Sequence, residues 1–111
     1  MNRFRVVVLG QKALIHGTLD DQETWVRNRT FAHVTEVNGA QRQNDLFGKA
    51  YAMTWVARVR GTVTADGVAF PKENVPDDEL EMLPVIQIRK HANRTDIYFA
   101  RDREVNADEL E

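Results

Sequence analysis

The sequence predicts a mainly β protein, a small antiparallel β-barrel or sandwich of about six strands with one or two short helices. Three observations support this fold class. Short β-branched segments recur and end at glycine, proline or asparagine. The segment Tyr51–Arg60 alternates apolar and polar side chains, which is the period of a half-buried strand. The chain of 111 residues is 42% hydrophobic, which suits one soluble domain. We expect a barrel domain over residues 1–101 and a mobile acidic tail over residues 102–111.

The strands are expected in chain order between turn signals. Gly10 ends the first strand, and Asn38-Gly39 ends the second. Residues 11–25 read as a connection because Gly17 and Asp20-Asp21 favour turns. Residues 61–70 read as a hairpin or a bent pair of short strands around Asp66-Gly67. The remaining expected strands span residues 3–9, 30–37, 51–60, 84–90 and 94–101, the last two joined by a tight turn in which Asn93 can take a left-handed conformation.

Helical structure is expected in two places. Residues 40–50 carry apolar side chains at helical spacing, although Asn44 and Gly48 weaken that interpretation. Pro76 precedes a run of acidic residues, which suits the first turn of a helix that Pro84 then ends. Strand alternation predicts the core residues Val6, Val8, Ala32, Val34, Met53, Trp55, Ala57, Ile86, Ile88, Ile97 and Phe99.

Residue types that carry common chemistry are scarce. The chain has no cysteine and no serine, and it contains no glycine-rich phosphate loop. Its three histidines lie on different elements, and the acidic run from Asp77 lacks the spacing of a calcium loop. We therefore expect no catalytic residue, no cofactor and no metal site, and a protein that is not an enzyme. No segment approaches the roughly 20 apolar residues of a membrane span, so a soluble intracellular protein is expected.

Charge is divided unevenly along the chain. Residues 1–60 contain nine Lys/Arg and five Asp/Glu, whereas residues 61–111 contain six and twelve. Complementary patches of this kind steer association, although charges also cluster by chance. The eleven arginines against four lysines suit interfaces or phosphate contact. An alternative function is therefore a small barrel that binds single-stranded nucleic acid, although Tyr51 and Trp55 lie on the apolar strand face rather than on a stacking surface.

A series of short motifs resembles the phage head-closure family, also called head-tail joining or stopper proteins. The order is Thr24-Trp25, then Phe31-Ala32-His33-Val34, then Gly39-Ala40-Gln41, then Val56-Ala57-Arg58, and finally two strands from Ile88 to Ile97 that include Arg94. The segment 3–9 would be the first strand of the family. Phe31 stands where the family has tryptophan, and Gln41 stands where glutamate is common. The excursion from Pro71 to Pro84 is longer than the family pattern, so its alignment stays open.

The resemblance implies a subunit of a homo-oligomeric ring in the neck of a tailed-phage virion, made in the host cytoplasm before assembly. Such a ring would close the DNA channel after packaging and dock the tail. Its partners would be other copies of itself, portal and adaptor proteins of the head, tail proteins, and packaged DNA that passes without sequence readout; no membrane is involved. The expected channel or closure segment consists of Asn38, Gly39, Gln41, Arg42, Gln43, Asn44 and Asp45.

Subunits in a ring meet through two different patches, which must complement each other. The divided charge supplies candidates for both patches. The expected subunit interface has a basic surface and an acidic surface, formed respectively by Arg27, Arg29, Arg58 and Arg60 and by Asp77, Asp78, Glu79 and Glu81. Single exposed ion pairs contribute about 0–1 kcal/mol each, so several would have to act together.

Overall fold

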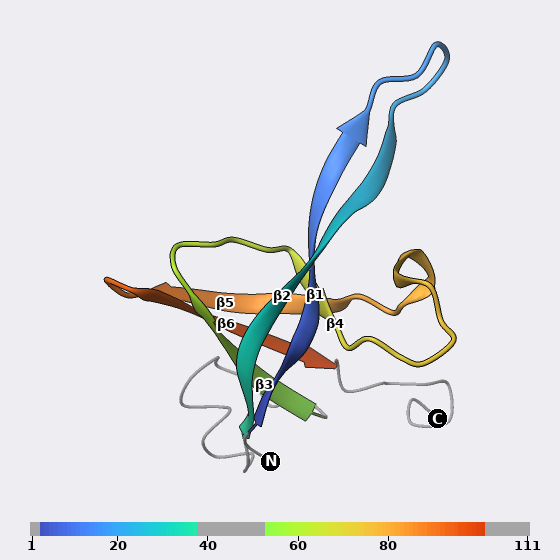
Figure 1. Cartoon of the computed structure of the whole chain (residues 1–111). Coiled ribbons are helices and arrows are strands. Elements are labelled where there is room, and N and C mark those ends of the chain that lie inside the picture. The colour runs from blue at the N-terminus through green and yellow to red at the C-terminus, as the bar shows by residue number, and fades with distance from the viewer. Residues whose placement is uncertain (1–2, 38–52, 102–111) are drawn as a thin grey trace, which may run out of the picture.

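The computed structural model describes residues 3–37 and 53–101, and these form a closed antiparallel β-barrel (Figure 1). Around the barrel the strand order is β1-β2-β3-β6-β5-β4. This confirms the predicted fold class. The elements of the described part are β1 Arg3–Ile15, β2 Gln22–Val37, β3 Met53–Arg60, β4 Gly67–Ala69, the 3-10 turn η1 Asp77–Glu79, β5 Leu83–Lys90 and β6 Arg94–Arg101.

The barrel interior is filled by small and β-branched side chains around two phenylalanines. Phe99 is fully buried, and its ring centroid lies 5.5 Å from those of Trp55 and Phe70. The guanidinium of Arg5 lies 4.4 Å from the centre of the Phe70 ring, so a cation–π contact borders this aromatic group. The buried members of the interior cluster are Val7, Leu9, Ala32, Val34, Ala57, Val59, Ala65, Val68, Leu83, Ile97 and Phe99.

The predicted facing of the first strand is wrong. Val7 and Leu9 point into the barrel, whereas Val8 packs on the outside with Ala69 and Leu80. The long connection between β4 and β5 covers this part of β1, so β1 is buried on both faces. Its apolar run therefore does not alternate with polar residues, and the pattern does not show which side faces inward. Of the other predicted core residues, Ile86 belongs to a third, outer cluster, and Val6, Met53 and Ile88 are only half-buried.

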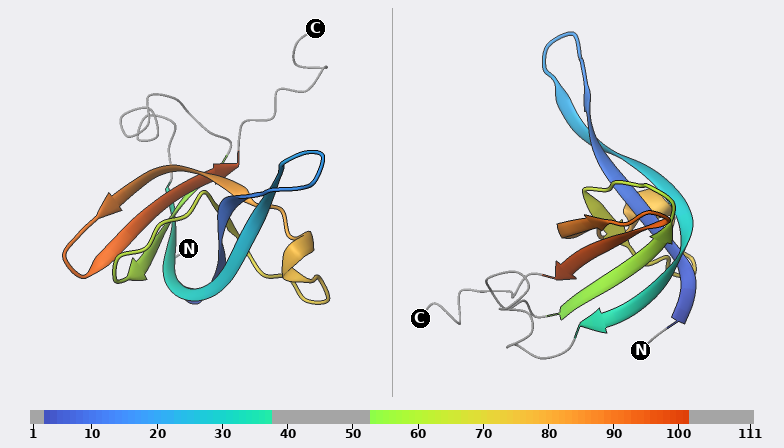
Figure 2. Two further views of the ribbon diagram at one scale, coloured as in Figure 1. Left: turned by 90° about the horizontal axis from the view of Figure 1, so that it is seen from above. Right: turned by 90° about the vertical axis from the view of Figure 1, so that its left-hand side faces the viewer.

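The first two strands are much longer than predicted. β1 continues through Gly10, and it pairs with β2 from Arg3↔Val34 to Ile15↔Gln22. The predicted connection 11–25 is thus mostly a two-stranded ribbon, which projects from the barrel (Figures 1 and 2). We call residues 11–26 the arm.

The remaining turns differ in detail from the sequence expectations. No hairpin forms within residues 61–70, because β4 pairs instead with β1 and β5. Pro84 lies inside β5, and the short helical turn that follows Pro76 is confirmed. The predicted turn between β5 and β6 is also confirmed, but the non-glycine residue with positive φ in the described part is Asn74, at 64°, rather than Asn93.

Candidate functional site

The structure joins members of the two predicted charged surfaces within one chain. Arg29 donates hydrogen bonds of 2.8 Å and 2.7 Å to the two carboxylate oxygens of Asp77. This hydrogen bond lowers the pKa of Asp77, and the charges of Arg29 and Arg27 lower it further. The same hydrogen bond raises the pKa of Arg29. The pair therefore ties η1 to the outer face of β2.

The other predicted acidic residues lie on the same connection. Glu81 faces Arg101, with 3.3 Å between the carboxylate oxygen and the guanidinium nitrogen, while Asp78 and Glu79 are exposed. On β2, the Nε atom of Arg27 is buried without a hydrogen-bond partner. The role of all eight predicted residues in a subunit interface stays a prediction.

Arg58 and Arg60 lie on the outer face of β3, where the neighbouring strands add further basic residues. Arg58 is opposite Asp96 of β6, and Asp96 is in turn opposite Arg89 of β5. Arg60 is opposite Arg94. We call Arg58, Arg60, Arg89 and Arg94 the basic face. Sequence reasoning found the β3 pair, but only the strand register adds Arg89 and Arg94.

Asp96 lies at the centre of the basic face and is only 4% exposed. Its carboxylate is 3.2 Å from Nε2 of His91, and Nε of Arg94 lies 3.1 Å from Oδ1, an ion-pair distance without hydrogen-bond geometry. Arg58 donates a 3.2 Å hydrogen bond to the Thr35 hydroxyl. The face thus contains four arginines and one buried carboxylate, and it keeps an excess of positive charge.

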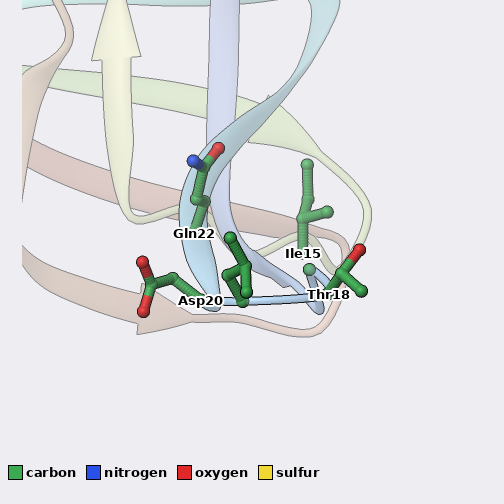
Figure 3. Close-up of a pocket in the computed structure, with 6 residues that line it drawn as sticks. Ile15, Thr18, Asp20 and Gln22 are labelled. Atoms are coloured by element: carbon green, nitrogen blue, oxygen red, sulfur yellow. The ribbon is translucent and has the colours of Figure 1, made fainter.

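The arm is the second feature available for contacts. Its exposed apolar side chains include Leu14, Ile15, Val26 and, in the turn, Leu19, which is 94% exposed. At the tip, residues Ile15 to Gln22 surround a shallow hollow (Figure 3). His16 lies 3.1 Å from the carboxylate of Asp21 there. The arm carries one lysine, Lys12, against the carboxylates of Asp20, Asp21 and Glu23.

Trp25 anchors the base of the arm to the barrel. Gly10 and Gly67 are opposite each other on β1 and β4, and the Trp25 ring lies over both. Lys12 Nζ is 5.5 Å from the centre of the same ring. The Lys12 amide also donates a 2.8 Å hydrogen bond to the Asp66 carboxylate. No pattern in the sequence indicated this contact, because Gly10 was interpreted as the end of a strand.

A second hollow lies between the base of the arm and the connection from β3 to β4. Its volume is about 460 Å³, and it is lined mainly by polar side chains with Leu9 and Val63. Within residues 3–37 and 53–101, no three His, Asp or Glu side chains gather where they could hold a metal ion. The same part of the chain contains no helix that is long and apolar enough to cross a membrane.

The predicted channel segment and the predicted acidic tail fall outside the described residues. The segment of Asn38, Gly39, Gln41, Arg42, Gln43, Asn44 and Asp45 follows Val37, the last residue of β2. The arm is at the first residues of β2, so the segment joins the opposite end of that strand.

Comparison with known proteins identifies no family for this chain. No family model matches the chain, and no curated protein or solved structure matches it significantly.

Proposed function

We propose that this protein is a virion structural protein of a tailed phage, a head-completion subunit that forms a ring in the neck, closes the DNA channel and docks the tail. The observation that carries the proposal is the projecting arm with its exposed apolar side chains, above all Leu19 at 94% exposure. Side chains of this kind on a protruding element mark a surface that another protein covers. The motif order that resembles the head-closure family supplies the identity of the assembly.

The barrel itself suits a structural subunit. Its interior is filled by side chains, and the hollows at the arm tip and at the base of the arm are open to the surface. Contacts must then be made by the outer surface and by the projecting elements. The arm and the predicted channel segment join opposite ends of β2, which allows one subunit to contact a neighbour and the channel at the same time.

The direct test uses DNA-filled heads that lack only this protein, from the phage that encodes it. Adding the purified protein should place it at the head vertex, retain the packaged DNA and permit tail attachment. Each step can be followed by sedimentation of the heads, by DNA release and by plaque formation. Heads that neither bind the protein nor gain tails would overturn the proposal.

The basic face favours one other function, binding of single-stranded nucleic acid. Backbone phosphates suit a surface of four arginines. The face is poorly suited to base stacking, because Tyr98, the aromatic residue beneath Arg89, is only 8% exposed. Affinity for an oligonucleotide that falls steeply with salt, and that depends on Arg60 and Arg89, would favour this alternative over ring assembly.

A further inference from the structure

The arm has the surface properties of an element that a partner protein covers. Leu14 and Ile15 are 56% and 54% exposed near its end, and Leu19 in the turn is almost fully exposed. Polar residues normally occupy the tip of a solvated hairpin, because an exposed apolar cluster promotes association. The arm also keeps an open edge, since β2 pairs with β3 only from His33 onward in the described residues. A partner can therefore contact both side chains and backbone.

Charge indicates which surface the arm fits. The tip presents Asp20, Asp21 and Glu23 beside its leucines. The basic face presents four arginines on three neighbouring strands, with Arg58 and Arg89 opposite the buried Asp96. Opposite net charge on two separate surfaces of one chain is the requirement for a heterologous contact between identical copies.

The arm cannot make this contact within its own chain. Figures 1 and 2 show the arm projecting away from the barrel, in a different direction from the β5–β6 hairpin that carries Arg89 and Arg94. Two of the four acidic residues predicted from sequence for the same role are less available, because Asp77 is bound to Arg29 and Glu81 faces Arg101, while Asp78 and Glu79 are exposed. The arm differs in combining exposed carboxylates with exposed apolar side chains, although Asp21 lies 3.1 Å from His16 and Glu23 lies 3.8 Å from Lys12.

We propose that the arm of one copy docks on the basic face of the next copy, with its leucines covered and its carboxylates paired to Arg60, Arg89 and their neighbours. The occupant is a second copy of this chain rather than nucleic acid, because the exposed leucines of the arm complement protein and not phosphate. Repetition of a heterologous contact builds a ring when the rotation closes. The inference rests on the proposed ring assembly and names the surfaces that make it.

Cysteine cross-linking tests the contact directly, since the chain has no cysteine of its own. Thr18→Cys places a thiol at the tip, and Asn93→Cys places one beside Arg94, both at exposed positions and without removing a proposed contact. The two single-cysteine proteins are mixed at high concentration and oxidised. We expect the mixed dimer to exceed the twofold excess over each self-linked dimer that random pairing of equal amounts would give. The control replaces Asn93→Cys with Lys72→Cys, an exposed site on the connection between β4 and β5 and outside the basic face.

Charge reversal tests the pairing. Asp20→Lys with Glu23→Lys reverses the charge of the arm. Arg60→Glu with Arg89→Gln reverses the charge of the face without placing a second carboxylate opposite Asp96. Each reversal alone should abolish the mixed cross-link, and combining the reversed arm with the reversed face should restore it. Arg60→Gln with Arg89→Gln is the milder variant of the face, and circular dichroism confirms that each variant is folded.

Three results would overturn the inference: no cross-link above the Lys72 control, dominant arm-to-arm dimers, or cross-linking that ignores charge reversal. Salt-sensitive oligonucleotide binding that is lost in the face variant would assign the face to nucleic acid instead. These experiments distinguish failure of the arm-to-face contact from failure of the proposed function. Normal joining to phage heads without an arm-to-face cross-link leaves the neck role standing, and a cross-link without joining leaves the self-contact standing.

Discussion

Gly10 lies under the indole of Trp25, and the contact is close enough to exclude a side chain. A Cβ atom at this position would lie 2.8 Å from Cε3 of Trp25 and would also meet the end of Met82. Overpacking of this kind is destabilising by about 1–3 kcal/mol. We expect Gly10→Ala to lower the free energy of unfolding by that amount, measured by urea denaturation. The same change in a Trp25→Ala background should have a smaller effect, and equal effects in both backgrounds would show that the ring does not restrict this position.

The Arg29–Asp77 pair makes stability depend on pH. The pKa of Asp77 is lower in the folded protein than in the unfolded chain, so its contribution is present above the unfolded pKa of about 3.9 and is lost as pH falls through the folded pKa. Asp77→Asn should therefore destabilise the protein at neutral pH, and its difference from wild type should shrink below about pH 4. Urea unfolding at several pH values measures this. Asp78→Asn, at an exposed neighbour, is the control and should change stability less.

At the scale of elements, β3 supplies one wall of the aromatic group inside the barrel. Trp55 packs against Phe70 and Phe99, with ring centroids 5.3 Å and 5.5 Å away. Trp55→Ala removes both contacts and should lower stability by about 3 kcal/mol, the lower part of the range for large-to-small changes, because the side chain is only partly buried. Thermal and urea unfolding measure the effect. Unchanged stability would remove Trp55 from the core.

The arm should be dispensable for folding and required for association. Ala13 and Thr24 are opposite each other in the ribbon, so residues 14–23 can be replaced by Asn-Gly, the preferred two-residue hairpin turn. Trp25 and its contacts stay in place. We expect stability within about 1 kcal/mol of wild type, since the removed side chains are largely exposed. Sedimentation at high concentration should show loss of self-association, and a shortened protein that associates normally would contradict the role of the arm.

At the scale of the whole molecule, the structure indicates that Arg60 and Arg89 are better positions than Arg58 for testing assembly by mutation. Arg58 is hydrogen-bonded to Thr35 and lies opposite the buried Asp96, so a glutamate there would place two carboxylates together and threaten the fold. Arg60 and Arg89 are exposed. Because Arg89 also lies opposite Asp96, it is changed to glutamine, and Arg60→Glu with Arg89→Gln should leave the barrel folded and reduce joining to DNA-filled heads, measured by incorporation after sedimentation. Normal incorporation of the folded variant would place the interface elsewhere.

Periodicity and turn chemistry determined much of the fold from the sequence alone. The alternation over Met53–Arg60, the turn between β5 and β6 and the proline before η1 are local signals, and each was interpreted correctly. Together with chain length they predicted a small antiparallel barrel or sandwich of about six strands. The arginines of β3 were also placed correctly on the outer face, because strand alternation fixes the side of each residue once one face is known.

Only the tertiary structure decided the features that are not local. Gly10 continues a strand because Trp25, distant in sequence, covers it. Val7 rather than Val6 faces inward, and the apolar run did not reveal this because the connection after β4 also buries the outer side of β1. The basic face exists because the register sets Arg60 beside Arg94 and Arg89 beside Asp96. Arg29 and Asp77, predicted for opposite surfaces, are bound to each other within the chain. Sequence pattern gives the side of a strand on which a residue lies, but contact between strands depends on register and closure, which long-range packing determines.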